Sequence, residues 1–310
     1  MVQAAVIPAT PDTSPPVIPS TSINVSALNE KVRESVVNIL CTITNGPQVS
    51  ALTGSGVIID SRGVILTNAH IGQYFLLKDV YGQGSLDCVI RTGNPAREMY
   101  HGELLYLSTQ WLKENQNEIT SEKPMGTGEN DFALILITKN ANGTPFSGAI
   151  TALNIDVSDI KIEDAGTETE VLVGYPAGFL GATSISRDLD LVSAVSTIKQ
   201  IFTFKETTID LISLGGSVVA QRGSSGGAVV STDTGKLIGI FVTTSEGATT
   251  GERDLRAITL SHINRGFKLE TGTDILDYIA GDLNFRLIQF QNILFPTLST
   301  ALKSALTKTN

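Results

Sequence analysis

Short runs of β-branched residues, separated by Gly, Asn or Asp, recur through most of this chain. Such side chains favour strands, and turn residues at this spacing are typical of antiparallel sheets. Eleven strand candidates follow, at residues 35–44, 55–60, 63–67, 86–91, 131–138, 169–175, 191–204, 207–213, 226–231, 236–244 and 255–261. So many short strands predict an all-β body of two packed antiparallel β-barrels over residues 27–265.

Three segments depart from this pattern. Residues 1–26 are rich in Pro, Thr and Ser, a composition that cannot pack a core and predicts an extended tether. Residues 93–129 predict a polar insertion in the first barrel, with a helix between Leu104 and Glu118. Residues 266–310 carry apolar side chains at helical spacing and predict a helical extension packed on the body. A partner-binding or oligomerising tail, or an interfacial membrane helix, is the alternative for this extension.

Composition and charge exclude several classes of function. With 41% hydrophobic and 17% charged residues, the chain can bury a sizeable core. Its formal net charge of −9 makes a phosphate backbone an unsuitable partner, so we expect no nucleic-acid binding. No uncharged apolar stretch reaches the roughly 18 residues that a membrane span needs. Membrane association is therefore expected only through an N-terminal anchor removed from the chain, and an oligomer remains compatible with the sequence.

The two cysteines, Cys41 and Cys88, both lie in apolar, strand-like runs. Two buried free thiols are one interpretation, and a disulfide between neighbouring strands, which implies an oxidising compartment, is the other. No histidine lies at the spacing of a zinc site, so we predict no metal and no cofactor. Since no signal peptide is visible in the first residues, we expect either an extracytoplasmic protein whose export signal is absent from this sequence or, as the alternative, a cytoplasmic one.

Three segments supply the groups needed for acyl transfer by an alcohol. The first ends in Thr-Asn-Ala-His70, where an imidazole follows a predicted hairpin and is suited to act as a base near neutral pH. The second places Asp131 at the start of an apolar strand, where a carboxylate can orient that imidazole. A bystander histidine and a turn aspartate are the plainer interpretations of these two residues.

The third segment is Gly-Ser-Ser-Gly-Gly over residues 223–227, in which Ser225 is the candidate nucleophile. Its glycines allow a tight turn, so that backbone amides around Gly223, Ser224 and Ser225 can form an oxyanion hole. Glycine-rich serine turns are common and mostly structural. The segment is specific mainly in combination with the other two.

Together these segments resemble the trypsin-like serine peptidases, and within them the HtrA-like bacterial branch. The matching pieces occur in the family's order, at residues 54–60, 67–70, 131–135, 173–178, 223–227, 235–240 and 256–259. The resemblance implies a chymotrypsin-like fold of two six-stranded-type antiparallel β-barrels and a serine endopeptidase acting on polypeptides. It makes His70 the general base, Asp131 its orienting group and Ser225 the nucleophile. It further implies a role in protein quality control or processing.

The chain departs from the family at two places. Ser224 stands where HtrA-like enzymes usually carry Asn and trypsin carries Asp, and no Ile-Val-Gly-Gly start is present, so activation by a freshly cut amino terminus is not expected. The PDZ domain that usually accompanies HtrA-like peptidases does not fit in the 45 residues after Arg265. We therefore expect no PDZ domain and no activation by one.

The resemblance also implies a primary substrate pocket formed by five residues, namely Val219, Ala220, Val242, Thr243 and Thr244. None of them is acidic, so a substrate lysine or arginine would lack a partner there. We expect a small or medium aliphatic residue before the scissile bond.

Two other interpretations remain. Residues 223–227 also fit the nucleophile elbow of α/β-hydrolases, with Asp254 and His262 following in that family's order. That fold needs a strand, a turn and a helix in a parallel sheet, whereas residues 226–244 predict a strand, a turn and a strand. A protease-like fold that acts as a binding or chaperone module is the non-enzymatic alternative. His101 and His262 are interpreted as structural or surface residues.

Overall fold

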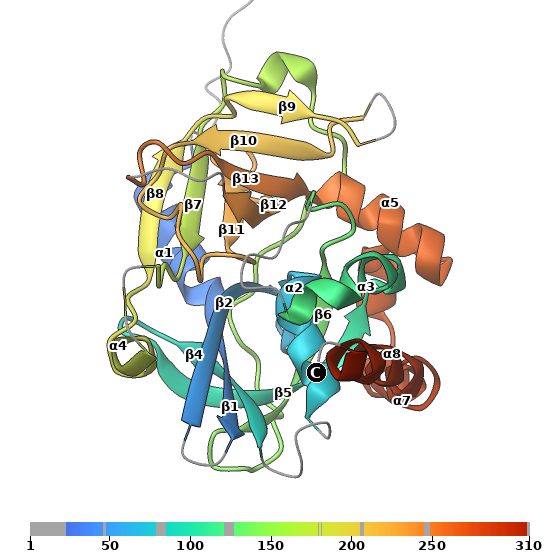
Figure 1. The fold of residues 1–310 in the computed structure, drawn as a ribbon. Coiled ribbons are helices and arrows are strands. Elements are labelled where there is room, and N and C mark those ends of the chain that lie inside the picture. The colour runs from blue at the N-terminus through green and yellow to red at the C-terminus, as the bar shows by residue number, and fades with distance from the viewer. Residues whose placement is uncertain are drawn as a thin grey trace, which may run out of the picture.

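The computed structural model describes residues 23–45, 48–78, 85–120, 127–178, 180, 182–204, 208–244 and 249–308. Residues 1–22 of the predicted tether lie outside this part of the chain. Two β-structures lie one above the other in Figure 1, with helices at their sides. The first comes from the N-terminal half of the sequence and the second from the C-terminal half.

The first structure is a closed, fully antiparallel barrel of six strands in the order β1-β2-β3-β6-β5-β4. Its strands are β1 Val36–Asn45, β2 Gln48–Asp60, β3 Val64–Thr67, β4 Leu86–Thr92, β5 Arg97–Leu107 and β6 Ala133–Asn140. Alternate side chains of the strands point inward and fill its core, among them Ile39, Ile65 and Ile135, all fully buried. This barrel confirms the first half of the predicted fold.

The second structure is a seven-stranded antiparallel sheet in the order β8-β7-β11-β12-β13-β10-β9. Its strands are β7 Glu170–Gly174, β8 Val192–Ser196, β9 Gln200–Phe202, β10 Leu211–Gly215, β11 Ala228–Ser231, β12 Leu237–Thr244 and β13 Leu255–Thr259. The sheet curls into a half-barrel, so the predicted chymotrypsin-like, all-β architecture is confirmed with one closed and one open unit.

Strand β5 corrects the prediction of a polar, partly helical insertion over residues 93–129. Arg97–Leu107 closes the barrel between β4 and β6, and the helix predicted to begin at Leu104 begins only at Thr109. The outer half of β5 is exposed and polar, and Gly102 interrupts it. A side chain there would come within 2.7 Å of Ile135, so glycine is needed for close packing although it weakens the strand signal.

Other boundaries differ by a few residues. The single strand predicted at 191–204 is two strands, β8 and β9, and β2 begins seven residues earlier than predicted. The last predicted strand, 255–261, ends at Thr259, whose side chain accepts a hydrogen bond from the amide of His262 and so caps the next helix. His262 therefore lies on a helix.

Helices cover both structures. They are α1 Val25–Ser35, α2 Ala69–Gly72, α3 Thr109–Asn115, α4 Ala182–Arg187, α5 Leu260–Thr271, α6 Ile275–Ala280, α7 Leu283–Ile293 and α8 Phe295–Lys308, with short 3-10 turns at Gln73–Leu77, Gln116–Thr120 and Ile162–Asp164. The predicted helical extension is thus formed by the end of α5 and by α6 to α8. Within the described ranges, every helix is too short or too polar to cross a bilayer.

Helix α1 contacts both β-structures, whereas helices α7 and α8, at the other end of the chain, pack on the barrel. Helix α1 precedes the barrel in sequence, yet Arg33 donates hydrogen bonds to the carbonyl of Leu191 and the hydroxyl of Ser193, beside and on β8 of the sheet. Helices α7 and α8 follow the sheet and pack on the barrel (Figure 1). There the hydroxyl of Ser299 donates to the carbonyl of Leu76 at 2.9 Å.

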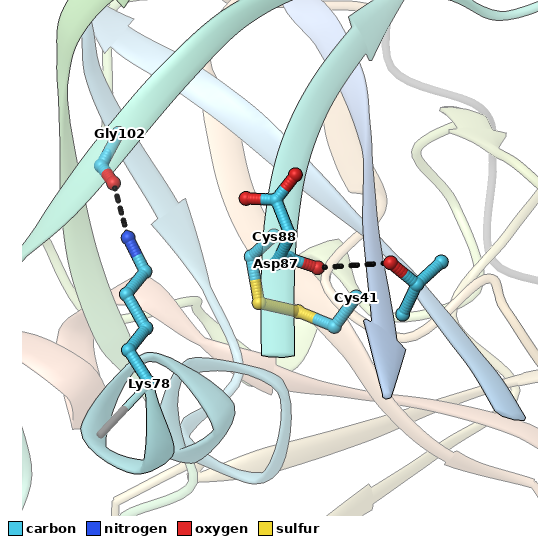
Figure 2. The surroundings of a disulfide bond; sticks show 6 residues. Cys41, Lys78, Asp87, Cys88 and Gly102 are labelled. Carbon is cyan, nitrogen blue, oxygen red and sulfur yellow. Dashed lines mark hydrogen bonds between the residues drawn. A yellow bond between two sulfur atoms is a disulfide. The ribbon is translucent and has the colours of Figure 1, made fainter. Parts of the chain in front are cut away.

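Cys41 and Cys88 form a disulfide bond between β1 and β4, as Figure 2 shows. The two residues face one another in the strand register and both are buried in the barrel core. Next to them, the Thr42 hydroxyl donates to the Asp87 carbonyl, and Lys78 donates to the carbonyl of Gly102 on β5. Of the two interpretations of the cysteines, the structure supports the disulfide.

Candidate active site

His70 lies at the rim of the barrel, where the chain leaves β3. The four residues of β3 are buried, and the chain turns directly into α2, which lies on the side of the barrel that faces the sheet (Figure 1). The amide of the Asn68 side chain donates to the carbonyl of Asp131 at 2.9 Å and so fixes the start of this turn. The imidazole is thereby held near the boundary between the two β-structures.

Asp131 orients the imidazole with both of its carboxylate oxygens. Asp131 Oδ2 lies 2.7 Å from His70 Nδ1, and Oδ1 accepts the backbone N–H of His70 at 2.9 Å. Asn130, just before it, has φ 59°, a left-handed conformation that asparagine tolerates and that turns the aspartate toward α2. With Nδ1–H donating to the carboxylate, the neutral ring presents Nε2 as a proton acceptor.

The environment of His70 has opposing effects on its pKa. Burial lowers the pKa, because it disfavours the charged imidazolium, while the charge of Asp131 and its hydrogen bond raise it. The net result is a pKa above the ordinary value of 6.5. The side chain is still 32% exposed, so it can reach a group in solution. A base with a raised pKa and an accessible nitrogen is suited to accept a proton from a neighbouring alcohol.

Ser225 lies in the loop between the sheet strands β10 and β11 and is anchored to the barrel. Its carbonyl accepts the backbone N–H of Ser55, on β2, at 2.7 Å. The next residue, Gly226, has φ +84°, and a Cβ there would lie 2.1 Å from the Ser55 carbonyl and 2.7 Å from the Thr67 hydroxyl. Only glycine fits this approach, which sets Ser225 beside the strand end that precedes His70.

The structure thus brings two of the three predicted residues into direct contact and places the third at the same boundary. His70 and Asp131 are hydrogen-bonded, whereas no hydrogen bond joins His70 to Ser225 among the residues that the structure describes. Hydrogen bonds between base and nucleophile are often long in free enzymes and shorten when substrate binds.

The predicted oxyanion hole needs one correction. The amide of Ser224 donates to the carbonyl of Gln221 at 3.2 Å and closes a turn, so this amide is occupied. Gly223, at φ +91°, occupies the left-handed position of that turn. The Arg222 carbonyl accepts the N–H of Ala177 at 2.7 Å, and in a trans peptide the N–H of Gly223 therefore faces the opposite way. The amides of Gly223 and Ser225 remain as the candidate donors.

The predicted pocket residues divide between two clusters. Val219 and Ala220 are fully buried in the core of the sheet, and Val242 packs against Gly128 of the loop that leads to Asp131. The side chains of Thr243 and Thr244 lie outside the described part of the chain. Arg253, which the sequence did not single out, donates to the Ala220 carbonyl at 3.4 Å.

The α/β-hydrolase interpretation is wrong for this chain. Ser225 leads into β11, which pairs antiparallel with β12, so the strand–turn–helix of an elbow is absent at this position. Asp254 hydrogen-bonds to Ser213 and Arg256, and His262 pairs with Asp210 at 3.1 Å.

The third histidine of the chain, His101, lies away from the other two, on the barrel strand β5. His101, on β5, lies 3.5 Å from Glu98, which fits the structural role predicted for it. Within the described ranges, no group of three or more His, Cys, Asp or Glu side chains is arranged to hold a metal ion.

Sequence reasoning missed three residues around residues 221–225, here called the serine loop. They are Ser55 on β2, and Tyr175 and Ala177 just after β7. Ser55 and Ala177 hydrogen-bond to the loop, and the N–H of Tyr175 donates to the hydroxyl of Ser55. All three lie in segments that carried the resemblance, so their motifs were a signal. The contacts themselves join residues 45, 120 and 168 positions apart in the chain, and no local sequence pattern encodes them.

Comparison with known proteins bears on the family. No curated protein matches the chain. Among solved structures, that of the HtrA-type protease AlgW with a tripeptide matches at 18% sequence identity with a TM-score of 0.49. That match covers 81% of this chain, which spans 65% of the length of the matched one. Residues 54–240, more than half of the chain, match the trypsin-like peptidase domain family. This range contains His70, Asp131 and Ser225, and the chain belongs to the trypsin-like peptidases.

Proposed function

We propose that this protein is a serine endopeptidase in which His70, Asp131 and Ser225 form the catalytic triad. The observation that carries the proposal is the pairing of His70 with both oxygens of Asp131 at the rim of the barrel. This pairing leaves Nε2 unprotonated in the neutral ring, on the side-chain end away from the carboxylate. The placement of Ser225 against β2 and β3 supports its role as the nucleophile.

The reaction follows from these roles. His70 Nε2 takes the proton of the Ser225 hydroxyl as Oγ attacks the scissile carbonyl, and the amides of Gly223 and Ser225 stabilise the resulting oxyanion. His70 then gives the proton to the leaving amine, and the C–N bond breaks to leave an acyl-enzyme. Water, deprotonated by the same imidazole, releases the acid and restores the serine. Asp131 keeps its charge throughout and stabilises the imidazolium.

The proposed substrate preference rests on the residues that the family resemblance assigns to the primary pocket. Val219, Ala220 and Val242 are apolar, and Arg253 donates to the carbonyl of Ala220. None of these residues carries a carboxylate that could pair with a substrate lysine or arginine, so we expect small or medium aliphatic residues before the scissile bond. The substrates are polypeptides, and a role in HtrA-like quality control or processing fits this preference.

An extracytoplasmic location accompanies the proposal. The Cys41–Cys88 disulfide supports it, because such bonds form and persist in oxidising compartments. The cell envelope, the periplasm and the exterior all satisfy this condition.

Two measurements on the folded protein test the proposal. Wild type should be labelled by a fluorophosphonate and should digest an unfolded protein, with cleavage sites mapped by mass spectrometry. Both activities should vanish in Ser225→Ala and in His70→Ala and should persist in the control His101→Ala, which alters a histidine on the outer half of β5. Absence of labelling in folded, monodisperse wild type would contradict catalysis and favour a binding or chaperone module.

A further inference from the structure

The serine loop has all of its carbonyl groups held. From Gln221 to Ser225, each carbonyl oxygen accepts a hydrogen bond, and the donors are Ser224 N, Ala177 N, Ser55 Oγ, Gly227 N and Ser55 N, in chain order. A trans peptide points its carbonyl and its N–H in opposite directions. Holding the carbonyls therefore fixes the direction of the intervening amides, including those of Gly223 and Ser225.

Ser55 is the one donor in this set that comes from the barrel, and it contributes twice. Its hydroxyl donates to the carbonyl of Gly223 at 3.0 Å, and its backbone N–H donates to the carbonyl of Ser225 at 2.7 Å. The carbonyl of Gly223 belongs to the peptide that separates the two candidate oxyanion donors. Ser55 therefore holds the loop at its midpoint and at the nucleophile.

The Ser55 hydroxyl also joins two segments of the second β-structure. While it donates to Gly223, it accepts the backbone N–H of Tyr175 at 3.0 Å. Two residues further along, the N–H of Ala177 holds the carbonyl of Arg222. The hydroxyl thus fixes the distance between the serine loop and the segment that supports it. The backbone carbonyl of Ser55 accepts a hydrogen bond from the hydroxyl of Thr67 at 2.7 Å, and this bond fixes β2 against the end of β3.

Burial makes this hydroxyl hard to replace. Ser55 has no exposed surface, so water cannot take over its bonds without opening the boundary between the two β-structures. Removing the hydroxyl leaves the N–H of Tyr175 and the carbonyl of Gly223 buried without their partner. The Gly223 carbonyl is then free to seek another donor, and the glycine, having no Cβ, allows the peptide to rotate.

We propose that Ser55 of the barrel is a positioning residue for the oxyanion hole. Its hydroxyl acts on the serine loop, which belongs to the seven-stranded sheet. The inference rests on the proposed peptidase function and deepens it. If an oxyanion-hole amide points in the wrong direction, the transition state loses more stabilisation than the ground state, because the oxyanion exists only after attack.

The test compares Ser55→Ala with wild type after the active sites have been titrated with a fluorophosphonate. We expect kcat per titrated site to fall about 10- to 100-fold, with KM within about twofold, which is the scale for a weakened oxyanion donor. A peptide aldehyde, which forms a tetrahedral adduct with the serine, should bind more weakly by a similar factor. The corresponding peptide alcohol, which has neither a carbonyl group to attack nor a charged oxygen, should bind as in wild type.

Two further variants keep the test decisive. Ser35→Ala removes another fully buried serine hydroxyl, which donates only to the Lys31 carbonyl within α1, and it should leave kcat unchanged. If Ser55→Ala does not fold, Ser55→Cys provides the measurement, because a thiol is similar in size to a hydroxyl but a weaker hydrogen-bond donor. The kcat of Ser55→Cys should fall below that of wild type, by a smaller factor than the one expected for Ser55→Ala.

Two results would overturn the inference while leaving the proposed function intact. One is a kcat per titrated site within twofold of wild type. The other is an equal loss of affinity for the aldehyde and for the peptide alcohol, which indicates general distortion of the site. If wild type itself is folded but neither labelled nor active, the proposed function is wrong, and the inference falls with it.

Discussion

The closed barrel and the seven-stranded sheet hold their parts of the candidate site in different ways. The barrel contributes His70 and Asp131, which contact each other directly, so this half assembles the pair from its own residues. The sheet contributes Ser225 on a loop whose carbonyls are held partly by Ser55 of the barrel. The base is thus fixed within one unit, whereas the geometry of the nucleophile depends on contact between the two.

The two structures also differ in how they are stabilised. The barrel has the Cys41–Cys88 disulfide between β1 and β4 and is covered by α7 and α8. The sheet carries a buried acid, Glu170, at the start of β7, and one oxygen of this carboxyl has no hydrogen-bond partner. The barrel therefore gains a covalent constraint, while the sheet contains a group whose charge is costly to bury.

The largest effect is expected when the hydrogen-bonded pair of the barrel, His70 and Asp131, is broken. Asp131→Asn should lower kcat about 10,000-fold with little change in KM, because an amide favours the wrong imidazole tautomer and cannot stabilise the imidazolium. Kinetics on a peptide substrate measure it. Asp87→Asn, at an exposed position of β4, is the control and should keep full activity. A loss smaller than tenfold in Asp131→Asn would contradict the role given to this carboxylate.

The pH dependence of the rate in wild type and in Asp131→Asn gives a second test of the same pair. Catalysis needs the unprotonated imidazole, and the pKa of His70 is raised above 6.5 because Asp131 outweighs burial. The rate of wild type should therefore rise with pH through an inflection above that value. In Asp131→Asn burial remains and the carboxylate is lost, so the inflection should move to lower pH.

The next effect concerns the covalent constraint. The double variant Cys41→Ala and Cys88→Ala should lose about 2–4 kcal/mol of unfolding free energy, because the unfolded chain regains the freedom that the cross-link removed. Urea unfolding measures this loss. Since neither cysteine contacts the site residues, kcat at a temperature where the variant is folded should match wild type. A tenfold loss of kcat would show that the disulfide shapes the site.

The smallest effect concerns the buried acid of the sheet. Burial, with help from the nearby Glu168 and Asp233, raises the pKa of Glu170 to about 8 from 4.5. The folded state then keeps a proton that the unfolded chain releases, so this contribution to stability is complete below pH 4.5 and is lost as pH rises through about 8. Glu170→Gln removes the dependence.

Melting temperature against pH checks this prediction. Relative to wild type, Glu170→Gln should gain roughly 5 °C on going from pH 5 to pH 9, as expected for a change of a few kcal/mol in a domain of this size. Glu114→Gln, at an exposed position on α3, is the control and should follow wild type at every pH. Parallel curves for Glu170→Gln and wild type would contradict the burial of a protonated carboxyl.

Much of this architecture could be predicted from the sequence, for identifiable reasons. Strands such as β3 and β6 are continuous apolar runs bounded by turn residues, and the pattern located both. Strand β5 was missed because its outer half is polar and Gly102 interrupts it, and only the closure of the barrel requires a strand there. The disulfide stayed undecided because it depends on the register of β1 against β4, which two separate runs do not encode.

The candidate site shows the same limit. The residues of the His70–Asp131 pair were predicted from motifs, and the structure brings them together. The role of Ser55 depends on contacts with residues 120 and 168 positions away, made where the two β-structures meet. The occupied amide of Ser224 likewise depends on a turn that the glycines permit but do not specify.

The packing of the terminal helices has a consequence for how the molecule holds together. Helix α1 is followed at once by the barrel but is bonded to the neighbourhood of β8, and α8, at the far end of the chain, is bonded to the barrel turn at Leu76. Helix α1 thus joins the sheet to the barrel that follows it, and α8 joins the barrel to the chain that follows the sheet. A cut in the segment between β6 and β7 would yield two fragments that stay associated, and pulling on either terminus would load both halves at once.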